Sequence, residues 1–561
     1  MGTRWMGATA QVAGALALAG AMWGYGVGAA SAAPDAAGNG TLAAAYAQGA
    51  PAHARRDVYG VVNLVPPPVF RAFINARSQV AFEYTALENS PSVGFFDGRR
   101  VIDAGLPGSL SSGLGALNDR GVLAAHTRPT IPETFLPYRW TAAGGLTFLP
   151  DPDPGADTFT TDINNRGQIV GGSQIVDRAV RWDAANRLVP LQLPPGYTQS
   201  FGGDINELNI TAGAAAAADG NLHAVLWDAA GRMIDLGTFG ATSAFSVALN
   251  NRNELAGTTM YLDSAGNQSF PGFLWNRRDG VAFVTPPGSN SFIAALNERN
   301  EAVGRLLSPD FTQNRAFYFS RKRGLVNLHR APYVESSAGD INDEGTIVGS
   351  MIRANPDRSR TELAFRWSNF VPVNLNTRLV HVPAGLVLNQ ALGISATGDI
   401  VATSNAGLVL LRHGGAGSDE PVLGPLTLSE PLRSGVETRL TLTFSDRNVR
   451  DSHTATVDWG DGSGPQPASV RESDGRGKVS ATHIYAAGGP FTIVVRVTDS
   501  TGKTTMTYRH VIVDLPMPDA NGGHAARATG AGSDALVQRR APWGAKLSPA
   551  LQAWLNRPRT K

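Results

Sequence analysis

Ile163-Asn164-Asn165-Arg166-Gly167-Gln168-Ile169-Val170-Gly171 is the clearest copy of a motif that recurs through most of the chain. The motif joins an apolar strand end to a polar corner, where Asn and Gly accept left-handed backbone angles, and then to a second apolar strand. It therefore predicts a β-hairpin. Copies recur about every forty to fifty residues. The clear ones are Leu249-Asn250 to Gly257, Leu296-Asn297 to Gly304 and Ile341-Asn342 to Gly349 with Gly345 at its corner, and looser ones start at Ile74, Leu117, Ile205 and Ile394.

A second motif follows each hairpin and ends in an aromatic residue. Its alternating, β-rich sequence predicts a third strand. A polar turn and a short apolar segment, such as Leu325 to Leu328, then predict a fourth strand. The aromatic ends are mostly tryptophans, which we expect to pack between repeats rather than to stack on sugar rings: Trp140, Trp182, Trp227, Trp275 and Trp367.

Four strands in about 45 residues are typical of a blade of a β-propeller. The last copy lacks a fourth strand, and Val61 to Leu64 near the N-terminus resembles the missing one. We therefore predict an all-β protein with an eight-bladed propeller over residues 57–413, closed by this N-terminal strand. Seven blades is the alternative, because the first two hairpin motifs are degenerate.

The paired motifs, such as His223-Ala224-Val225-Leu226-Trp227 with Ile163 to Gly171, resemble the extracellular HAF repeats of bacteria. The resemblance implies an exported protein with a propeller-like fold. It implies no particular reaction.

The sequence changes character after the Gly-rich residues 414–420, which we interpret as a linker. Short alternating strands over residues 421–515 predict an Ig-like β-sandwich. Two segments in this region are Asp458-Trp459-Gly460-Asp461-Gly462 and His483-Ile484-Tyr485, the second before an apolar strand that ends in Thr498-Asp499. Together they resemble the polycystic-kidney-disease (PKD) domain, in which Phe is usual at the position of Trp459.

The two ends of the chain have the composition of processing and tail segments. Residues 1–32 combine Arg4, an apolar stretch and small residues before Pro34, which predicts a secretory signal cleaved after Ala32. A retained membrane anchor is the alternative. Residues 33–56 form an Ala- and Gly-rich linker, and residues 516–561 a basic tail that we expect to be disordered apart from a helix-like piece at 548–556.

Composition excludes several classes of function. The chain has no cysteine, so disulfides, thiolate metal sites and a cysteine nucleophile are all excluded. Its 48 Lys plus Arg nearly balance 46 Asp plus Glu, so no overall field favours nucleic acid. After removal of the signal we expect no integral membrane segment, and a monomer.

Candidate metal ligands are few, and each has a structural interpretation that we favour. Asn164, Asn250, Asn297 and Asn342, with Asp162, Asp204 and Asp340 nearby, offer oxygens suited to calcium, but corner residues of this type bond to their own backbone. Asp458 and Asp461 are the calcium candidates of the sandwich, where a tight turn also uses them. We expect no cofactor and no catalytic residues, and interpret His483 and Tyr485 as packed strand residues. Four histidines fall at unequal positions that do not suggest a common metal centre: His126, His223, His329 and His381.

No catalytic motif is found in the sequence, although propeller active sites can assemble from distant loops. The pattern favours an exported, non-enzymatic binding or adhesion protein, whose partner is a glycan or an envelope protein and whose sandwich is a spacer or interaction module. Two alternatives stay open. One is a polysaccharide lyase or glycoside hydrolase, which would need two carboxylates facing a common cleft, and the other is a structural envelope component.

Overall fold

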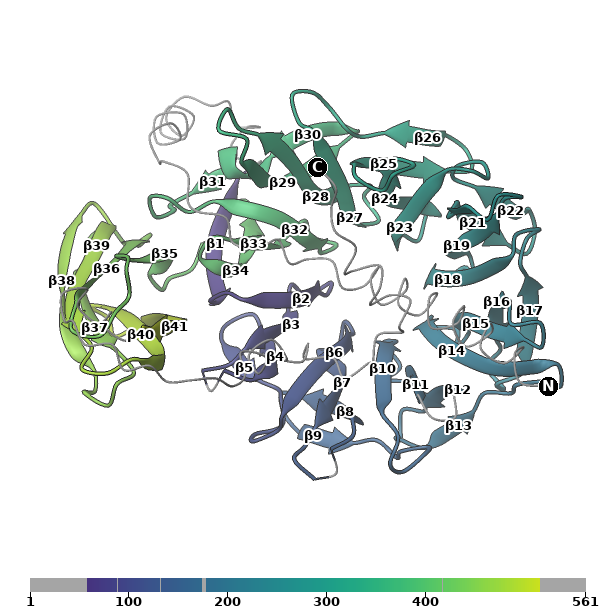
Figure 1. Cartoon of the computed structure of the whole chain (residues 1–561), viewed down its shortest axis with the longest axis horizontal. Coiled ribbons are helices and arrows are strands. Elements are labelled where there is room, and N and C mark those ends of the chain that lie inside the picture. Colours follow the sequence, from purple (N-terminus) through teal and green to yellow (C-terminus); the bar gives the residue numbers. More distant parts are fainter. Residues whose placement is uncertain (1–57, 88, 132, 174–177, 416, 515–561) are drawn as a thin grey trace, which may run out of the picture.

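A computed structural model describes residues 58–514, except 88, 132, 174–177 and 416. Almost every element is a β-strand. Eight sheets surround a central axis and form a disc, and seven further strands form a sandwich at its rim (Figure 1). The predicted class, an eight-bladed propeller followed by an Ig-like sandwich, is therefore confirmed. The seven-bladed alternative is wrong.

Each blade is built on four antiparallel strands, numbered outward from the axis, and each of the first seven blades is continuous in sequence. Blade 1 consists of β2 (Val69–Ile74), β3 (Val80–Thr85), β4 (Pro91–Phe96) and β5 (Val101–Asp103). Blade 2 consists of β6 (Ser111–Leu117), β7 (Val122–Arg128), β8 (Leu136–Thr141) and β9 (Gly145–Phe148). Blade 3 consists of β10 (Thr158–Ile163), β11 (Ile169–Ser173), β12 (Arg178–Trp182) and β13 (Leu188–Pro190). Blade 4 consists of β14 (Tyr197–Ile205), β15 (Thr211–Ala217), β16 (Leu222–Trp227) and β17 (Met233–Gly237).

The remaining blades repeat this order with small additions. Blade 5 consists of β18 (Ser243–Leu249), β19 (Leu255–Leu262), β21 (Gly272–Asn276) and β22 (Gly280–Phe283), with β20 (Gln268–Ser269) paired to β19. Blade 6 consists of β23 (Asn290–Leu296), β24 (Glu301–Leu307), β25 (Asn314–Ser320) and β26 (Gly324–Asn327). Blade 7 consists of β27 (Glu335–Ile341), β28 (Ile347–Ala354), β29 (Arg360–Ser368) and β30 (Val371–Asn374), followed by the short 3-10 helix η2 (Leu375–Thr377).

Blade 8 closes the ring with strands from both ends of the propeller sequence. It contains β32 (Leu388–Ile394), β33 (Ile400–Ser404) and β34 (Gly407–His413), and its fourth strand is β1 (Tyr59–Val65). The strand β1 lies antiparallel to β34, with Val61 opposite Leu411, and the short β31 (Leu379–Val380) pairs with its outer edge. The prediction that the N-terminal strand completes the last blade is confirmed.

A β-bulge explains why the hairpin motif ends in glycine. In blade 3 the register between the first two strands shifts between Thr160 and Asp162, and the equivalent shift occurs in blades 2 and 4 to 8. A Cβ on Gly171, opposite this bulge, would overlap the carbonyl oxygen of Phe159. Glycine is therefore needed where the second strand passes over the bulge.

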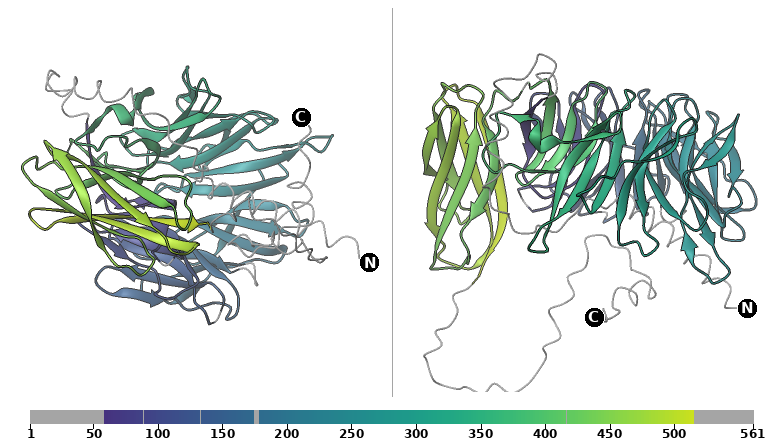
Figure 2. Two further views of the ribbon diagram at one scale, coloured as in Figure 1. Left: turned by 60° about the vertical axis from the view of Figure 1, so that its left-hand side comes forward. Right: turned by 90° about the horizontal axis from the view of Figure 1, so that it is seen from above.

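The C-terminal sandwich consists of seven strands that share one core. They are β35 (Val422–Leu428), β36 (Glu437–Ser445), β37 (His453–Asp458), β38 (Gln466–Ser473), β39 (Arg476–Ile484), β40 (Gly489–Asp499) and β41 (Thr504–Val513). The pairing order is β35-β36-β39-β38-β37-β40-β41. Leu440, Trp459 and Val495 are among the buried residues between the two faces, and Figure 2 shows the sandwich at the rim of the disc.

Several predictions concern residues outside the part that the structure describes. These are the signal segment 1–32 with its cleavage after Ala32, the linker 33–56, and the tail 516–561 with its helix-like piece. Within residues 58–514, no helix has the length and apolar character needed to cross a membrane.

Candidate functional site

The repeated asparagines form a ring of hydrogen bonds around one mouth of the propeller. Each lies directly after the innermost strand of its blade, and its Nδ2 donates to the backbone carbonyl of the equivalent residue in the next blade, at 2.9 to 3.2 Å. The seven donors are Asn75, Asn118, Asn164, Asn206, Asn250, Asn297 and Asn342. In blade 8 the equivalent residue is Ser395, which receives the bond from Asn342.

The amide oxygens of these asparagines are used within their own turns. The Oδ1 of Asn164 accepts the N–H groups of Arg166 and Gln168 at 3.1 and 3.0 Å, and Gly167 completes the corner with φ +79°. Gly345 has the same conformation, with φ +80°. This ring therefore fastens each of the first seven blades to the next and directs its amide oxygens into the corners rather than toward a shared ion.

A second ring of polar residues lies one position further along each turn, and the prediction missed it. In blades 2 to 7 a side-chain oxygen of this residue accepts the backbone N–H of the equivalent residue in the preceding blade, at 2.6 to 3.2 Å. The six residues, which we call the rim, are Asp119, Asn165, Glu207, Asn251, Glu298 and Asp343. The available signal was that the residue after the repeated asparagine is an acid or an amide in all six motifs.

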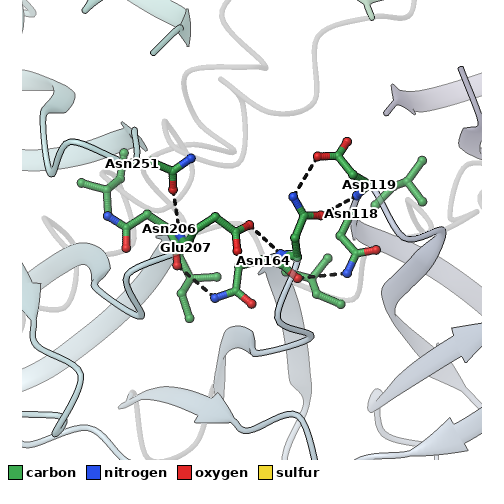
Figure 3. Close-up of a pocket in the computed structure, with 11 residues that line it drawn as sticks. Asn118, Asp119, Asn164, Asn206, Glu207 and Asn251 are labelled. Carbon is green, nitrogen blue, oxygen red and sulfur yellow. Dashed lines mark hydrogen bonds between the residues drawn. The ribbon is translucent and has the colours of Figure 1, made fainter. Parts of the chain in front are cut away.

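A depression of about 170 Å³ lies over the rim in blades 2 to 5 (Figure 3). Asp119, Asn165, Glu207 and Asn251 line it, and their backbone N–H groups are already engaged. The Nδ2 of Asn165 donates to Asp119 at 2.8 Å, and the Nδ2 of Asn251 donates to Glu298 at 2.8 Å. Because carboxylate and amide oxygens keep spare lone pairs, the depression offers acceptors to a ligand that carries hydroxyl or other donor groups.

Three half-buried aspartates on the innermost strands form hydrogen bonds to neighbouring blades. Asp162 accepts the N–H of Ile205 at 2.8 Å, Asp204 that of Leu249 at 2.7 Å, and Asp340 that of Ile394 at 2.9 Å. Each carboxylate thereby satisfies a donor at the inner edge of the next blade. The pattern recurs in only some blades, so it supports a structural role for each residue rather than a shared calcium site.

Burial raises the pKa of Asp204 well above its usual range, and the adjacent carboxyl of Asp162 raises it further. Part of Asp204 is exposed, but protein atoms surround its carboxyl closely enough that burial is the largest cause of the shift. Both effects disfavour the charged form of the Asp204 carboxyl.

We expect Asp204→Asn to stabilise the propeller more at pH 8 than at pH 4. The pKa of Asp204 in the folded protein exceeds the unfolded value of about 3.9. The wild-type carboxyl therefore makes its full contribution to the free energy of unfolding below that pH, and this contribution is lost as the pH rises through the folded pKa. An amide does not ionise, yet it accepts from Leu249 and donates to Asp162. Melting temperatures at both pH values measure the effect. Asp228→Asn is the control, and the pH dependence of its effect on stability should have the opposite sign, because the Arg232 backbone N–H lowers the pKa of that exposed carboxyl. Equal shifts at both pH values for Asp204→Asn would contradict the prediction.

The aromatic ends of the third strands lie at blade boundaries. Trp182, Trp227 and Trp367 are fully buried. Each indole N–H donates, at 2.8 to 3.1 Å, to a backbone carbonyl just after the outermost strand of the preceding blade. These carbonyls belong to Pro150, Gln192 and Leu328. Trp140 is buried as well, and Trp275 is half-buried. The four buried rings offer no open face for a sugar.

The four scattered histidines lie apart in the fold. His126 is buried against Phe135 and Phe159, and burial lowers its pKa to about 3. His223 bonds to Asp235 in blade 4, and His329 to Ser336 between blades 6 and 7. His381 lies in the loop before blade 8, with φ +52°. They share no centre.

The turn Asp458 to Gly462 of the sandwich is held by its own acids and by a histidine. Asp458 accepts the N–H of Gly460 at 3.0 Å, and Asp461 accepts that of Ser463 at 3.1 Å and pairs with His483 at 2.8 Å. The ring of His483 stacks on Trp459 at 4.9 Å, and the hydroxyl of Tyr485 donates to the Trp459 carbonyl at 3.1 Å. Hydrogen bonds from Ser463 and then His483 hold the pKa of Asp461 below its usual range.

A family model for the PKD domain matches residues 418–513. This segment is a PKD domain. The resemblance based on the Asp-Trp-Gly-Asp-Gly turn and the His-x-Tyr strand is confirmed for this part of the chain.

Comparison with known structures gives distant similarities to both parts. The PKD1 domain of Vibrio anguillarum Epp is 22% identical over 17% of this chain and 96% of its own, with a TM-score of 0.14. The β-propeller domain of the Trilobed protease from Pyrococcus furiosus is 7% identical over 57% of this chain and 98% of its own, with a TM-score of 0.34. The extracellular domain of a hybrid two-component system from B. thetaiotaomicron is 10% identical over 81% of this chain and 55% of its own, with a TM-score of 0.28. No curated protein matches the sequence.

The PKD domain contains a carboxylate cluster that the prediction missed. Asp446, Asp451 and Asp499 each place an oxygen within 4.8 Å of the others. The Oδ2 atoms of Asp451 and Asp499 are buried without a hydrogen-bond donor, and Asp499 is only 5% exposed. A buried carboxylate oxygen without a donor is unfavourable unless a cation lies beside it, and oxygen ligands of this kind suit calcium. The only sequence signal is that Asp446 directly follows β36 and Asp499 ends β40.

We expect calcium to raise the melting temperature of the PKD domain through this cluster. Binding to the folded form alone stabilises it by about 2.7 kcal/mol at a hundredfold excess over Kd. Asp499→Asn removes one ligand charge and should abolish the response in calorimetric scans with calcium and with EDTA. Asp461→Asn is the matched control, because Asp461 already pairs with His483. A calcium response that Asp461→Asn abolishes and Asp499→Asn keeps would refute this assignment.

Proposed function

We propose that the chain is an exported, non-enzymatic binding protein, in which the propeller presents a ligand site for a glycan or an envelope protein. The observation that supports it is the depression at the rim, which carboxylates and amides line and whose backbone N–H groups are already bonded within the protein. Hydroxyl-rich ligands match such a surface because each hydroxyl can donate to a carboxylate or amide oxygen.

The site is built for recognition by shape and hydrogen bonding. The two carboxylates of the depression, Asp119 and Glu207, each accept a backbone N–H from the preceding blade, so their positions are fixed before a ligand arrives. Such preorganisation lowers the entropic cost of binding. Asn165 lies between them and bonds to both.

Titration of the full chain with a panel of plant and bacterial polysaccharides, followed by calorimetry, tests the proposal. Glu207→Gln keeps the oxygen that accepts from Asn165 and removes the charge, so we expect it to weaken binding of the ligand found. Glu437→Gln, a half-exposed carboxylate on the PKD domain, should leave binding unchanged. A ligand that binds all three proteins equally would place the site elsewhere. A protein without any soluble ligand that stays with the cell surface on fractionation would support the structural envelope component.

The cellular address is part of the same proposal. Residues 1–32 are taken as a signal cleaved after Ala32, the repeats as the extracellular HAF type, and the mature protein as a monomer. Sequencing the N-terminus of protein recovered from culture medium and from periplasm tests cleavage and location together. An intact Met1 in both fractions would exclude cleavage after Ala32.

Blade 7 provides the observation that favours a polysaccharide-degrading enzyme. Glu335, 5% exposed, pairs with Arg360 at 2.6 Å and accepts a bond from Asn314 at 3.1 Å. Burial raises the pKa of the nearby Glu362, which the Ser350 hydroxyl contacts at 2.6 Å. Two neighbouring carboxyl groups, one of them with a raised pKa, are the residue types that glycoside hydrolysis uses.

Incubation with the same polysaccharides distinguishes the two functions. New reducing ends or unsaturated products that Glu362→Gln abolishes would replace the binding proposal by the enzymatic one. Binding without turnover, unaffected by Glu362→Gln, would exclude this pair as acid and base.

A further inference from the structure

We infer that the PKD domain is a clasp that holds the seam of the propeller closed. The seam is the junction between blade 8, which contains β1, and blade 1, which follows it in sequence. The PKD domain contacts both blades and the loop that precedes blade 8. This role differs from that of a spacer or of a ligand-binding module.

The outer edge of β1 is covered, whereas the outermost strands of the other blades pair on one side only. Beyond the short β31, the edge meets the segment that leads into the PKD domain. On this outer edge Ser418 donates its N–H to the Val61 carbonyl at 3.3 Å, while Gly414 extends the β34 ladder by donating to the Val58 carbonyl at 2.9 Å. The Gly-rich segment interpreted as a linker therefore lies along the closing strand.

The first strand of the PKD domain is fixed to the same closing strand. Asn63 of β1 bonds to Leu423 in both directions, with its Nδ2 donating at 3.2 Å and its Oδ1 accepting at 2.8 Å. Val422, 5% exposed, belongs to one buried cluster with Tyr59 and Val61. The hydrophobic core of blade 8 thus extends into the PKD domain.

Two further contacts hold the other sides of the seam. The hydroxyl of Tyr508, on the last PKD strand, is buried and donates to the Thr85 carbonyl of blade 1 at 2.5 Å. Thr443 and Ser445 donate to Ala384 and His381 in the loop before blade 8, at 2.7 and 2.8 Å. The PKD domain cannot leave its place without releasing both blades.

The clasp matters because the asparagine ring is weakest at this junction. Seven blade boundaries carry an amide-to-carbonyl bond of 2.9 to 3.2 Å. At the eighth, between blades 8 and 1, the only ring contacts are hydroxyl contacts of Ser78 with Ser395 and Thr397, at 3.5 and 3.4 Å among the described residues. Bonds this long are weak.

Hydrogen exchange of the full-length protein tests the clasp. In Asn63→Ala combined with Tyr508→Phe, we expect the β1 amides to exchange about tenfold faster or more, because opening of the seam requires less free energy. The outermost strands of blades 3 and 6, β13 and β26, should not change by more than about twofold.

Tyr485→Phe is the matched control. It also removes a buried tyrosine hydroxyl from a backbone carbonyl, but within the PKD domain and away from the seam. Faster β1 exchange in this variant, or unchanged exchange in the Asn63 and Tyr508 double variant, would overturn the inference. Should the double variant fold poorly, Thr443→Val with Ser445→Ala tests the same clasp from the half-buried Thr443 and the buried Ser445. Unchanged β1 exchange in that variant would count equally against the inference.

Discussion

Replacing Trp227 by alanine is expected to lower the free energy of unfolding of the propeller by about 3 to 5 kcal/mol. The indole is fully buried between blades 3 and 4, so its removal leaves a cavity at a blade boundary. The substitution also leaves the Gln192 carbonyl without the donor that lies 2.9 Å away. Urea unfolding followed by circular dichroism measures the loss.

Two variants separate the causes of this effect. Trp227→Phe keeps much of the ring volume and removes the N–H, so it should show the smaller, hydrogen-bond part of the loss. Trp275→Ala is the control for position, because Trp275 is only half-buried at the equivalent site of blade 5. A loss in Trp275→Ala as large as that in Trp227→Ala would show that burial between blades does not set the effect.

Replacing Val61 by aspartate is expected to detach the closing strand and to cost at least about 4 kcal/mol. Val61 is 1% exposed, pairs with Leu411 and lies in the shared core of blade 8 and the PKD domain. A carboxylate there would be buried among apolar side chains. Limited proteolysis should then cut near β1, and the melting temperature should fall sharply.

Val101→Asp is the matched control for this substitution. Val101 also lies on an outermost strand, β5 of blade 1, but it is 38% exposed. We expect its melting temperature to stay within a few degrees of the wild type. Similar stability of the two aspartate variants would mean that β1 does not close the ring.

The sequence was sufficient to predict the architecture because the fold repeats. The same hairpin motif encodes the corner at Asn164 and its equivalents, and the incomplete last copy, with Val61 to Leu64, predicted the closure. The motif contains the glycine as Gly171, but the sequence alone does not say why glycine is needed there. The structure gives the reason, because the Phe159 carbonyl lies where a Cβ on Gly171 would be.

Contacts between repeats could not be predicted from the sequence in the same way. The rim residues Asp119 and Glu207 belong to different blades, and their proximity follows from closure of the ring. Asp446, Asp451 and Asp499 come together across a sandwich, so the sequence indicated instead the acids of one turn, Asp458 and Asp461. Spacing along a chain reports local partners, whereas these clusters depend on tertiary packing.

The asparagine ring has a direction, because every amide donates in the same rotational sense from Asn75 to Asn342. A displacement of one turn is therefore transmitted by these hydrogen bonds to the turn of the next blade, and the row of bonds ends at Ser395. We expect a pulling force to open the ring first after Ser395, because this boundary alone, in the part of the propeller that the structure describes, lacks the amide bond.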